Sequence, residues 1–205
     1  MSPEHYFSPQ PSTPEKRRQI SVPLGGTVHR LETSGGIFSP DRIDKGTAIL
    51  LGGVPDPASS GNLLDLGCGW GPIALSMAMA SPEATVYGVD VNERSLALTR
   101  DNAATLGLKN VVVALPESID PAMTYNTIWS NPPIRIGKEA LHELLLLWLP
   151  RLAPGGIAWL VVQKNLGADS LQKWMIGVLP EDWTVERVST DNAFRILRVA
   201  RPEAS

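Results

Sequence analysis

The sequence predicts an α/β protein in which helices cover both faces of a mainly parallel, doubly wound sheet. From residue 62 onward, short apolar runs alternate with helical patterns of about 10–15 residues, as in βαβ units. A glycine-rich stretch, DLGCGWG, separates the first of these runs from the first helix pattern. Two strand-like runs at the end of the chain have no helix between them, so we expect an antiparallel pair at one edge of the sheet.

The chain divides into three predicted segments. Residues 1–20 are rich in proline, serine and charge, and we expect a flexible segment there. Residues 21–58 should form an extension made of a hairpin and a helix. The hairpin strands are expected at 19–23 and 27–33, and the helix within 41–54 with Asp44 as its N-cap. Residues 59–205 are the expected main domain.

Strands and helices should alternate along the main domain. The expected strands are 62–67, 84–90, 110–115, 125–130, 157–163, 183–189 and 194–200. The expected helices are 71–80, 92–107, 138–152 and 167–179. Pro72 falls in the first turn of its helix and Gly107 at the end of the next, which are favoured places for these residue types.

Composition excludes several classes of protein and site. The single cysteine, Cys68, rules out an internal disulfide and a cysteine-based zinc site, and the three histidines are too widely spaced to suggest any metal site. No apolar run approaches the ~20 residues of a membrane span, and the N-terminus lacks a signal-peptide core, so we expect a cytoplasmic protein without membrane contact. The net charge of −3 argues against a generally basic nucleic-acid binder, although a local basic patch stays possible.

The glycine-rich loop has the spacing D-x-G-x-G-x-G, from Asp65 through Gly67 and Gly69 to Gly71. It is neither the dinucleotide-binding pattern nor a P-loop. A carboxylate ahead of the glycines would repel a pyrophosphate but attract a cofactor that carries an ammonium and a sulfonium. Asp90 ends the next strand, where a carboxylate can accept hydrogen bonds from ribose hydroxyls. The alternative is a tight turn followed by an ordinary helix cap.

This loop together with Asp90 resembles that of class I S-adenosylmethionine-dependent methyltransferases. The resemblance implies S-adenosylmethionine as cofactor and a Rossmann-like sheet of seven strands whose last strand is antiparallel. It also implies that the glycines, with Asp65 and Cys68 in the same loop, surround the methionine part of the cofactor and that Asp90 holds its ribose. Glu117, which follows the third strand, stands near where such enzymes contact adenine, or it is an exposed acid.

The stretch SNPPIRIGK follows the strand at 125–130 and resembles the substrate motif of methyltransferases that modify planar amino groups. The nitrogen of such a group is a poor nucleophile because its lone pair is delocalised. Two acceptors that bind its N–H groups turn the lone pair toward the methyl group and stabilise the positive charge that develops. Asn131 and the Pro132 carbonyl are the expected acceptors, and Pro133 stiffens the loop. Ile134 stands where many relatives carry an aromatic residue that stacks on the target base.

The wider pattern, which includes GGIFSPDRIDKGTAILL and NPPIRIGKEALHELL, resembles the methyltransferase small-domain family. Well-known members methylate guanine N2 in ribosomal RNA of the small subunit, which implies ribosomal RNA or a ribosomal subunit as partner. By the same resemblance Phe38, Asp44 and Thr47 should lie across the cofactor site; the alternative is that Phe38 belongs to the core and Asp44 only caps a helix. Arg135, Lys138 and Lys164, together with Arg42 and Lys45, are the candidates for contacts with RNA phosphates, and the alternative is that each is ordinary solvated surface.

Two other functions stay open at this point. One is a methyltransferase that acts on a protein glutamine or a small-molecule amine, which the low net basicity favours and Ile134 disfavours. The other is a module that binds cofactor or RNA without catalysis, against which the complete motifs argue. The sequence does not fix the oligomeric state, although a monomer is favoured.

Overall fold

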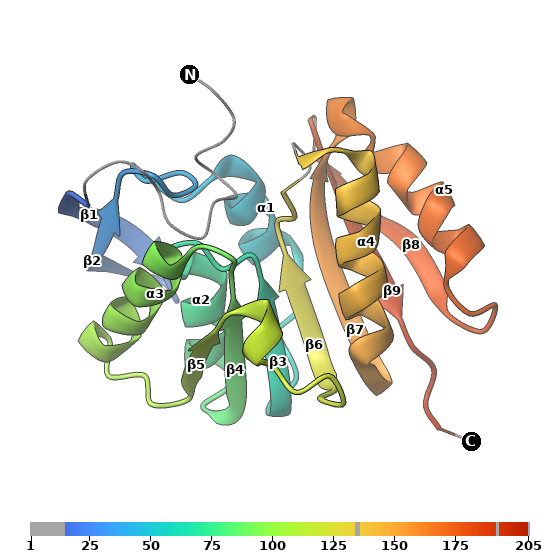
Figure 1. Cartoon of the computed structure of the whole chain (residues 1–205), viewed down its shortest axis with the longest axis horizontal. Helices are drawn as coiled ribbons and strands as arrows, with labels where there is room; N and C mark the ends of the chain where they lie inside the picture. Colours follow the sequence, from blue (N-terminus) through green and yellow to red (C-terminus); the bar gives the residue numbers. More distant parts are fainter. Residues whose placement is uncertain (1–14, 134–135, 192, 205) are drawn as a thin grey trace.

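A computed structural model describes residues 15–133, 136–191 and 193–204 of the chain. Its centre is a seven-stranded sheet with the order β5-β4-β3-β6-β7-β9-β8 (Figure 1). The strands are β3 (Ser60–Leu66), β4 (Glu83–Val89), β5 (Val111–Ala114), β6 (Tyr125–Ser130), β7 (Leu152–Gln163), β8 (Thr184–Asp191) and β9 (Phe194–Ala200). Strands β3 to β7 are mutually parallel, and β9 is antiparallel to both β7 and β8. The predicted doubly wound sheet and its antiparallel last pair are confirmed.

Helices cover both faces of this sheet. They are α1 (Lys45–Gly53), α2 (Pro72–Ala80), α3 (Glu93–Thr105), α4 (Lys138–Trp148) and α5 (Ala168–Val178). Successive residues of a strand point to opposite faces, so Leu64 and Leu66 of β3 pack with α4 and α5, while Leu63 packs with α1 and α2. No helix among the described residues is long and apolar enough to cross a membrane.

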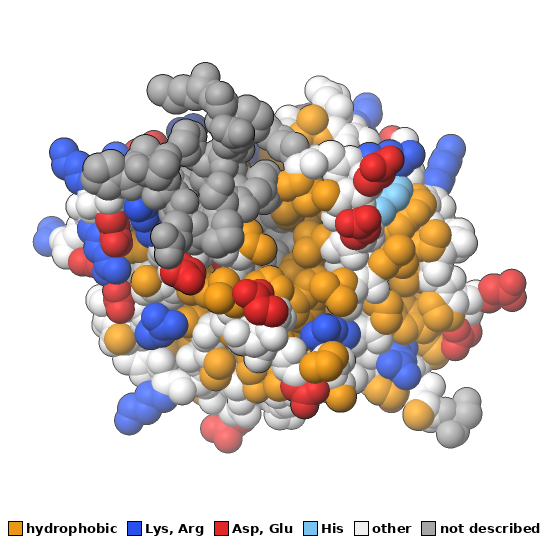
Figure 2. Space-filling view, viewed as in Figure 1, with side chains coloured by type: hydrophobic (Ala, Val, Ile, Leu, Met, Phe, Trp, Pro, Cys, Tyr) orange, Lys and Arg blue, Asp and Glu red, His pale blue; other side chains and the backbone are white. Residues whose placement is uncertain are grey.

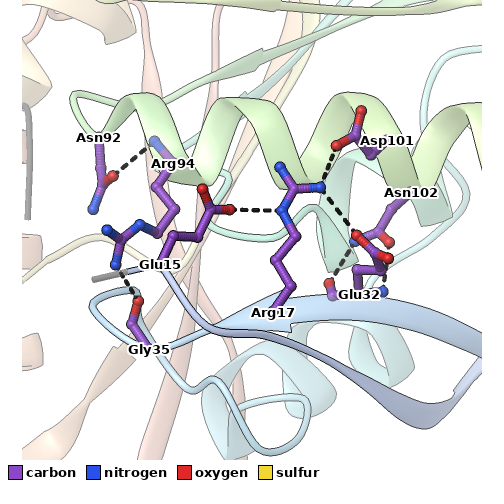
Figure 3. Close-up of polar contacts among 8 residues, drawn as sticks. All are labelled: Glu15, Arg17, Glu32, Gly35, Asn92, Arg94, Asp101 and Asn102. Atoms are coloured by element: carbon purple, nitrogen blue, oxygen red, sulfur yellow. Dashed lines mark hydrogen bonds and ion pairs between the residues drawn. The ribbon is translucent and has the colours of Figure 1, made fainter. Parts of the chain in front are cut away.

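The N-terminal hairpin pairs β1 (Arg17–Leu24) with β2 (Thr27–Ser34). Its first strand begins at Arg17, two residues before the strand expected at 19–23. The Arg17 guanidinium forms an ion-pair cluster, in which it donates to Glu15 at 2.6 Å, Glu32 at 3.0 Å and Asp101 at 2.5 Å (Figure 3). Because Asp101 belongs to α3, this cluster joins the hairpin to the main domain.

Two predicted boundaries near the fifth parallel strand were wrong. The helix expected at 138–152 ends at Trp148, and a 3-10 turn, Leu149–Arg151, follows because Pro150 cannot continue a helix. Strand β7 then begins at Leu152, five residues earlier than expected. Its pairing with β6 shifts between Tyr125 and Thr127, so residues 153–156 form an irregular corner of the sheet.

This corner yields a stability prediction. A Cβ at Gly156 would meet backbone atoms of Ala153 and Tyr125 at 2.8 and 2.9 Å, and backbone cannot move aside cheaply. We expect Gly156→Ala to lower the free energy of unfolding by about 2–3 kcal/mol in urea denaturation. The matched control is Gly177→Ala in α5, where a Cβ would meet nothing within 4 Å. It should raise the free energy of unfolding by about 0.5 kcal/mol, and equal effects of the two substitutions would contradict the account.

Candidate active site

Three predicted site segments meet at the carboxyl edge of the sheet. In the register of β3, Leu66 lies opposite Val89 of β4 on one side and Ser130 of β6 on the other. The residues that follow, Gly67, Asp90 and Asn131, therefore leave the sheet at one level. Ser130 Oγ donates a 2.7 Å hydrogen bond to the Leu66 carbonyl, which joins the last residue of β6 to the last residue of β3.

A cavity of about 270 Å³ opens at this edge. In Figure 2, hydrophobic side chains gather in the centre of the view and along α4, the helix that borders the cavity. Among the expected site residues, its lining includes Phe38, Gly67, Gly69, Asp90, Asn131 and Pro133. A smaller cavity of about 20 Å³ shares Phe38 and Asn131 with it and adds Asp44, Thr47 and Cys68. The two cavities place most of the expected residues at one site.

Several lining residues were missed by the sequence reasoning. They are Ile37, Leu66, Val89, Val91, Asn92, Ser95, Pro116, Ile136, Leu144, Leu147 and Trp148. Most are apolar and resemble ordinary core positions in the sequence, so no local signal marks them. Asn92 is the exception. Asn is a favoured helix N-cap, and this one follows Asp90 by two residues, so the sequence places it in the same turn at the edge of the sheet.

The glycine loop presents bare backbone to the cavity at two positions. Gly67 and Gly69 have φ angles of +84° and +58°, and a Cβ at either would meet nothing within 4 Å. Both glycines line the two cavities, so a ligand can approach their backbone closely. Gly71 differs from the expectation: a Cβ there would meet Thr99 at 3.0 Å, and the residue caps α2 instead of lining these cavities.

Asp65 is not at the cavity, which corrects the predicted cofactor contact. It alternates with Leu64 and Leu66 along β3, so its side chain points to the opposite face, toward α2. There it is fully buried, and Oδ2 accepts a 2.8 Å hydrogen bond from the Ala74 N–H. Burial raises the pKa of Asp65 to about 8, the Ala74 N–H opposes this rise and the charge of Asp90 adds to it. Asp65 therefore ties the loop to the first turn of α2.

Asp90 lies at the cavity with both carboxylate oxygens engaged. Oδ2 accepts from the Gly69 N–H and Oδ1 from the Asn92 N–H, each at 2.9 Å. Burial raises the pKa of Asp90, although N–H donors of Asn92, Gly69 and Val91 oppose this rise. Each oxygen has a further lone pair, so the carboxylate can still accept from hydroxyl groups of a ligand.

Two other expected cofactor residues have different surroundings. Cys68 is buried, its thiol accepts from Thr99 Oγ1 at 3.6 Å, and burial raises the pKa of the thiol well above its usual value. It lines only the smaller of the two cavities, as a packing residue that is not a thiolate nucleophile. Glu117 is exposed in the turn Pro116–Ser118, and its neighbour Pro116 lines the large cavity in its place. The expected adenine contact of Glu117 is thus not supported.

Asn131 is held by residues from the N-terminal extension. Its Nδ2 donates to Asp44 Oδ2 at 2.8 Å and to Thr47 Oγ1 at 3.2 Å. Asp44 was correctly predicted as the N-cap of α1, since its Oδ2 also accepts from the Gly46 N–H at 2.8 Å. The Pro133 carbonyl accepts a hydrogen bond from the Ile136 N–H at 3.1 Å.

The expected substrate and RNA residues are only partly described. Ile134 and Arg135 lie outside the described residues. Lys138 is exposed at the start of α4 and Lys164 is exposed directly after β7. Both follow the carboxyl ends of parallel strands, so they belong to the same edge of the sheet as Asn131.

The segment after the hairpin forms a wall of the large cavity through Ile37 and Phe38. Asn92 Nδ2 donates to the Gly36 carbonyl at 3.1 Å. Figure 3 shows a second bond to this segment, in which an Arg94 guanidinium nitrogen donates to the Gly35 carbonyl at 2.7 Å. On the other side, Trp70 Nε1 of the glycine loop donates to the Ser39 carbonyl at 3.2 Å. The wall is therefore fixed by the same segments that bear Asp90 and the glycines.

The buried carboxyl of Asp65 predicts a pH-dependent stability. Its pKa in the folded state, about 8, lies above the ordinary 3.8, so between these values the unfolded chain binds fewer protons than the folded one. Stability should therefore fall as pH rises through about 4 to 8, and Asp65→Asn should remove this contribution. Urea denaturation of both proteins at several pH values checks it, because parallel stability profiles would show that Asp65 does not titrate in this way.

The chain is similar to several known proteins. The model of the methyltransferase small domain family matches residues 29–198. Uncharacterized protein YbxB of Bacillus subtilis is 36% identical over 170 residues, which cover 82% of this chain and 85% of that protein. Ribosomal RNA small subunit methyltransferase C of Pseudomonas syringae pv. syringae is 34% identical over 172 residues, which cover 82% of this chain and 49% of that protein.

A solved structure with a similar fold is that of a 16S rRNA N2 methyltransferase of T. thermophilus in complex with AdoMet and guanosine. The TM-score is 0.77 at 22% identity, and the match covers 93% of this chain and 52% of that chain. The chain thus spans about half the length of the two ribosomal RNA methyltransferases it matches. From the family match over most of its length, the protein belongs to the methyltransferase small domain family.

Proposed function

We propose that the protein transfers a methyl group from S-adenosylmethionine to an exocyclic amine, namely N2 of guanine in ribosomal RNA. The observation that carries this proposal is the position of Asn131. It leaves β6 beside the glycine loop, lines the same cavity as Asp90, and has its amide nitrogen bound inside the fold. An acceptor oxygen thus stands next to a site whose features suit the cofactor.

The residues around the large cavity fit S-adenosylmethionine, which supplies an electrophilic methyl group on a sulfonium. Gly67 and Gly69 leave room for a ligand against their backbone. Asp90 can accept from ribose hydroxyls, and Val91 and Pro116 offer apolar surface for a flat adenine ring. Among the described residues that line this cavity, Asp90 is the one charged residue. No second carboxylate there competes with it for the hydroxyl groups of a ligand.

The chain's own contribution to transfer is orientation and charge stabilisation. Asn131 Oδ1 and the Pro132 carbonyl accept the two N–H groups of the amine and direct its lone pair at the methyl group. As the nitrogen becomes positive, both oxygens stabilise the charge, and the surplus proton leaves to water after transfer. The prolines hold the two acceptors in place before the substrate binds.

Ribosomal RNA is the favoured substrate because of the names of the relatives and the position of the cations. Two matched proteins are named as ribosomal RNA methyltransferases of the small subunit or of 16S rRNA. Lys138 and Lys164 are exposed at the edge of the sheet that bears Asn131, outside the large cavity. A neutral base would enter the cavity while these lysines contact phosphates at its margin.

The proposal predicts that Asn131→Ala lowers kcat by about 10²–10³-fold, since one acceptor of the developing charge is lost. Its Kd for S-adenosylmethionine should change little. Methyl incorporation from labelled cofactor into unmodified 16S rRNA and small subunits measures kcat, and calorimetry measures Kd.

Asp90→Ala is the variant to compare with Asn131→Ala. It should raise the Kd for the cofactor by about 10–100-fold, because the cofactor loses its hydrogen bonds to the Asp90 carboxylate. Normal turnover by Asn131→Ala would remove Asn131 from the mechanism. Label that enters a protein or a small amine while RNA stays unlabelled would refute the RNA substrate.

A further inference from the structure

We propose that Asp44 and Thr47 are positioning residues for methyl transfer. They hold the Asn131 amide with its oxygen toward the amine, and the negative charge of Asp44 strengthens that oxygen as an acceptor. This inference rests on the proposed function. In this arrangement the start of α1 contributes to methyl transfer by orienting Asn131. It binds neither the cofactor nor the substrate directly.

The orientation of Asn131 follows from what its partners can do. A carboxylate only accepts hydrogen bonds, so the amide must present its NH₂ group to Asp44 Oδ2 at 2.8 Å. The second amide hydrogen is directed to Thr47 Oγ1 at 3.2 Å. With both hydrogens used, Oδ1 is the atom of the amide left to face a ligand. An unheld asparagine would present NH₂ as readily as oxygen, and an NH₂ group would repel the N–H groups of the amine.

The two partners are themselves fixed. Asp44 caps α1, and its Oδ2 accepts from the Gly46 N–H at 2.8 Å and the Thr47 N–H at 3.4 Å. Thr47 is 4% exposed. A Cβ on Gly46 would lie 3.0 Å from Asp44 Oδ2, 3.1 Å from Phe194 and 3.3 Å from Asn131 Nδ2, so a side chain there would press on all three groups. The contact is therefore preorganised by helix capping and close packing.

The charge of Asp44 should reach the amine through the Asn131 amide. A hydrogen bond from Nδ2 to a carboxylate polarises the amide and makes its oxygen more negative. The oxygen then stabilises the positive nitrogen more than a neutral partner of the amide would allow. Asp44 does not touch the amine in this arrangement, so its effect should appear in kcat and not in binding.

Asp44 could serve only as the N-cap of α1, with no effect on methyl transfer. One substitution separates this structural role from the positioning of Asn131. Asp44→Asn keeps the volume and a good N-cap oxygen but removes the charge. We expect its kcat to fall about tenfold, with KM for RNA and Kd for S-adenosylmethionine within about twofold. The control is Asp120→Asn, because Asp120 also accepts from a backbone N–H two residues onward, that of Ala122, but lies outside the cavities described above. It should keep full kcat.

Thr47 gives an independent arm of the test. Thr47→Val removes the Oγ1 acceptor and should lower kcat severalfold. Thr47→Ser keeps a hydroxyl acceptor and should retain the kcat of the native enzyme. A rise in the Kd for S-adenosylmethionine in Thr47→Val, with kcat unchanged, would mean that Thr47 contacts the cofactor and would overturn its positioning role.

A readout without turnover keeps this inference separate from the proposed function. The side-chain amide resonances of Asn131, assigned as those absent from Asn131→Ala, should shift in Asp44→Asn and stay in place in Asp120→Asn. If the shift occurs but the native enzyme methylates no RNA, the positioning of Asn131 stands and the proposed substrate fails. Full kcat in Asp44→Asn, or unmoved resonances, would overturn the role of Asp44.

Discussion

The register of β3 against its two neighbours is the constraint on which the rest of the site depends. Leu66 faces Val89 on one side and Ser130 on the other, so the glycine loop, Asp90 and Asn131 all emerge at one level. A slip of one residue would turn every side chain of β3 to the opposite face. The buried side chains that alternate along this strand, including Asp65 toward α2, make such a slip costly. Packing in the interior thus sets the geometry at the edge.

The site is completed by a part of the chain that lies outside the parallel sheet. The extension from Arg17 to Gly53 supplies the cavity wall at Ile37 and Phe38 and the partners of Asn131 at Asp44 and Thr47. It is joined to the main domain by the Arg17 cluster and by the bonds from Asn92 and Trp70. The segment after the hairpin and the start of α1 therefore border the candidate site, and this one part of the chain supports both the cavity wall and the Asn131 side chain.

Local patterns predicted the fold and the two motif positions well, and failed where a residue's role depends on distant packing. Short-range sequence patterns predicted the alternation of strands and helices, the glycine loop, Asp90 and Asn131. Asp65 was misassigned because a strand buried on both faces does not reveal which way one acid points. For Glu117, the alternative of an exposed acid fits its exposed position in the turn Pro116–Ser118, which the sequence alone did not decide. The contact between Asp44 and Asn131 spans 87 positions, beyond any periodicity.

We propose that this chain places a methyl group on guanine N2 of ribosomal RNA. This proposal is tested most directly by mass spectrometry of nucleosides from the ribosomal RNA of cells with and without the gene. The account predicts that N2-methylguanosine is lowered by one site per ribosome when the gene is deleted. It also predicts that the native gene restores this site whereas the Asn131→Ala gene does not. Unchanged N2-methylguanosine in the deletion strain would contradict the claim.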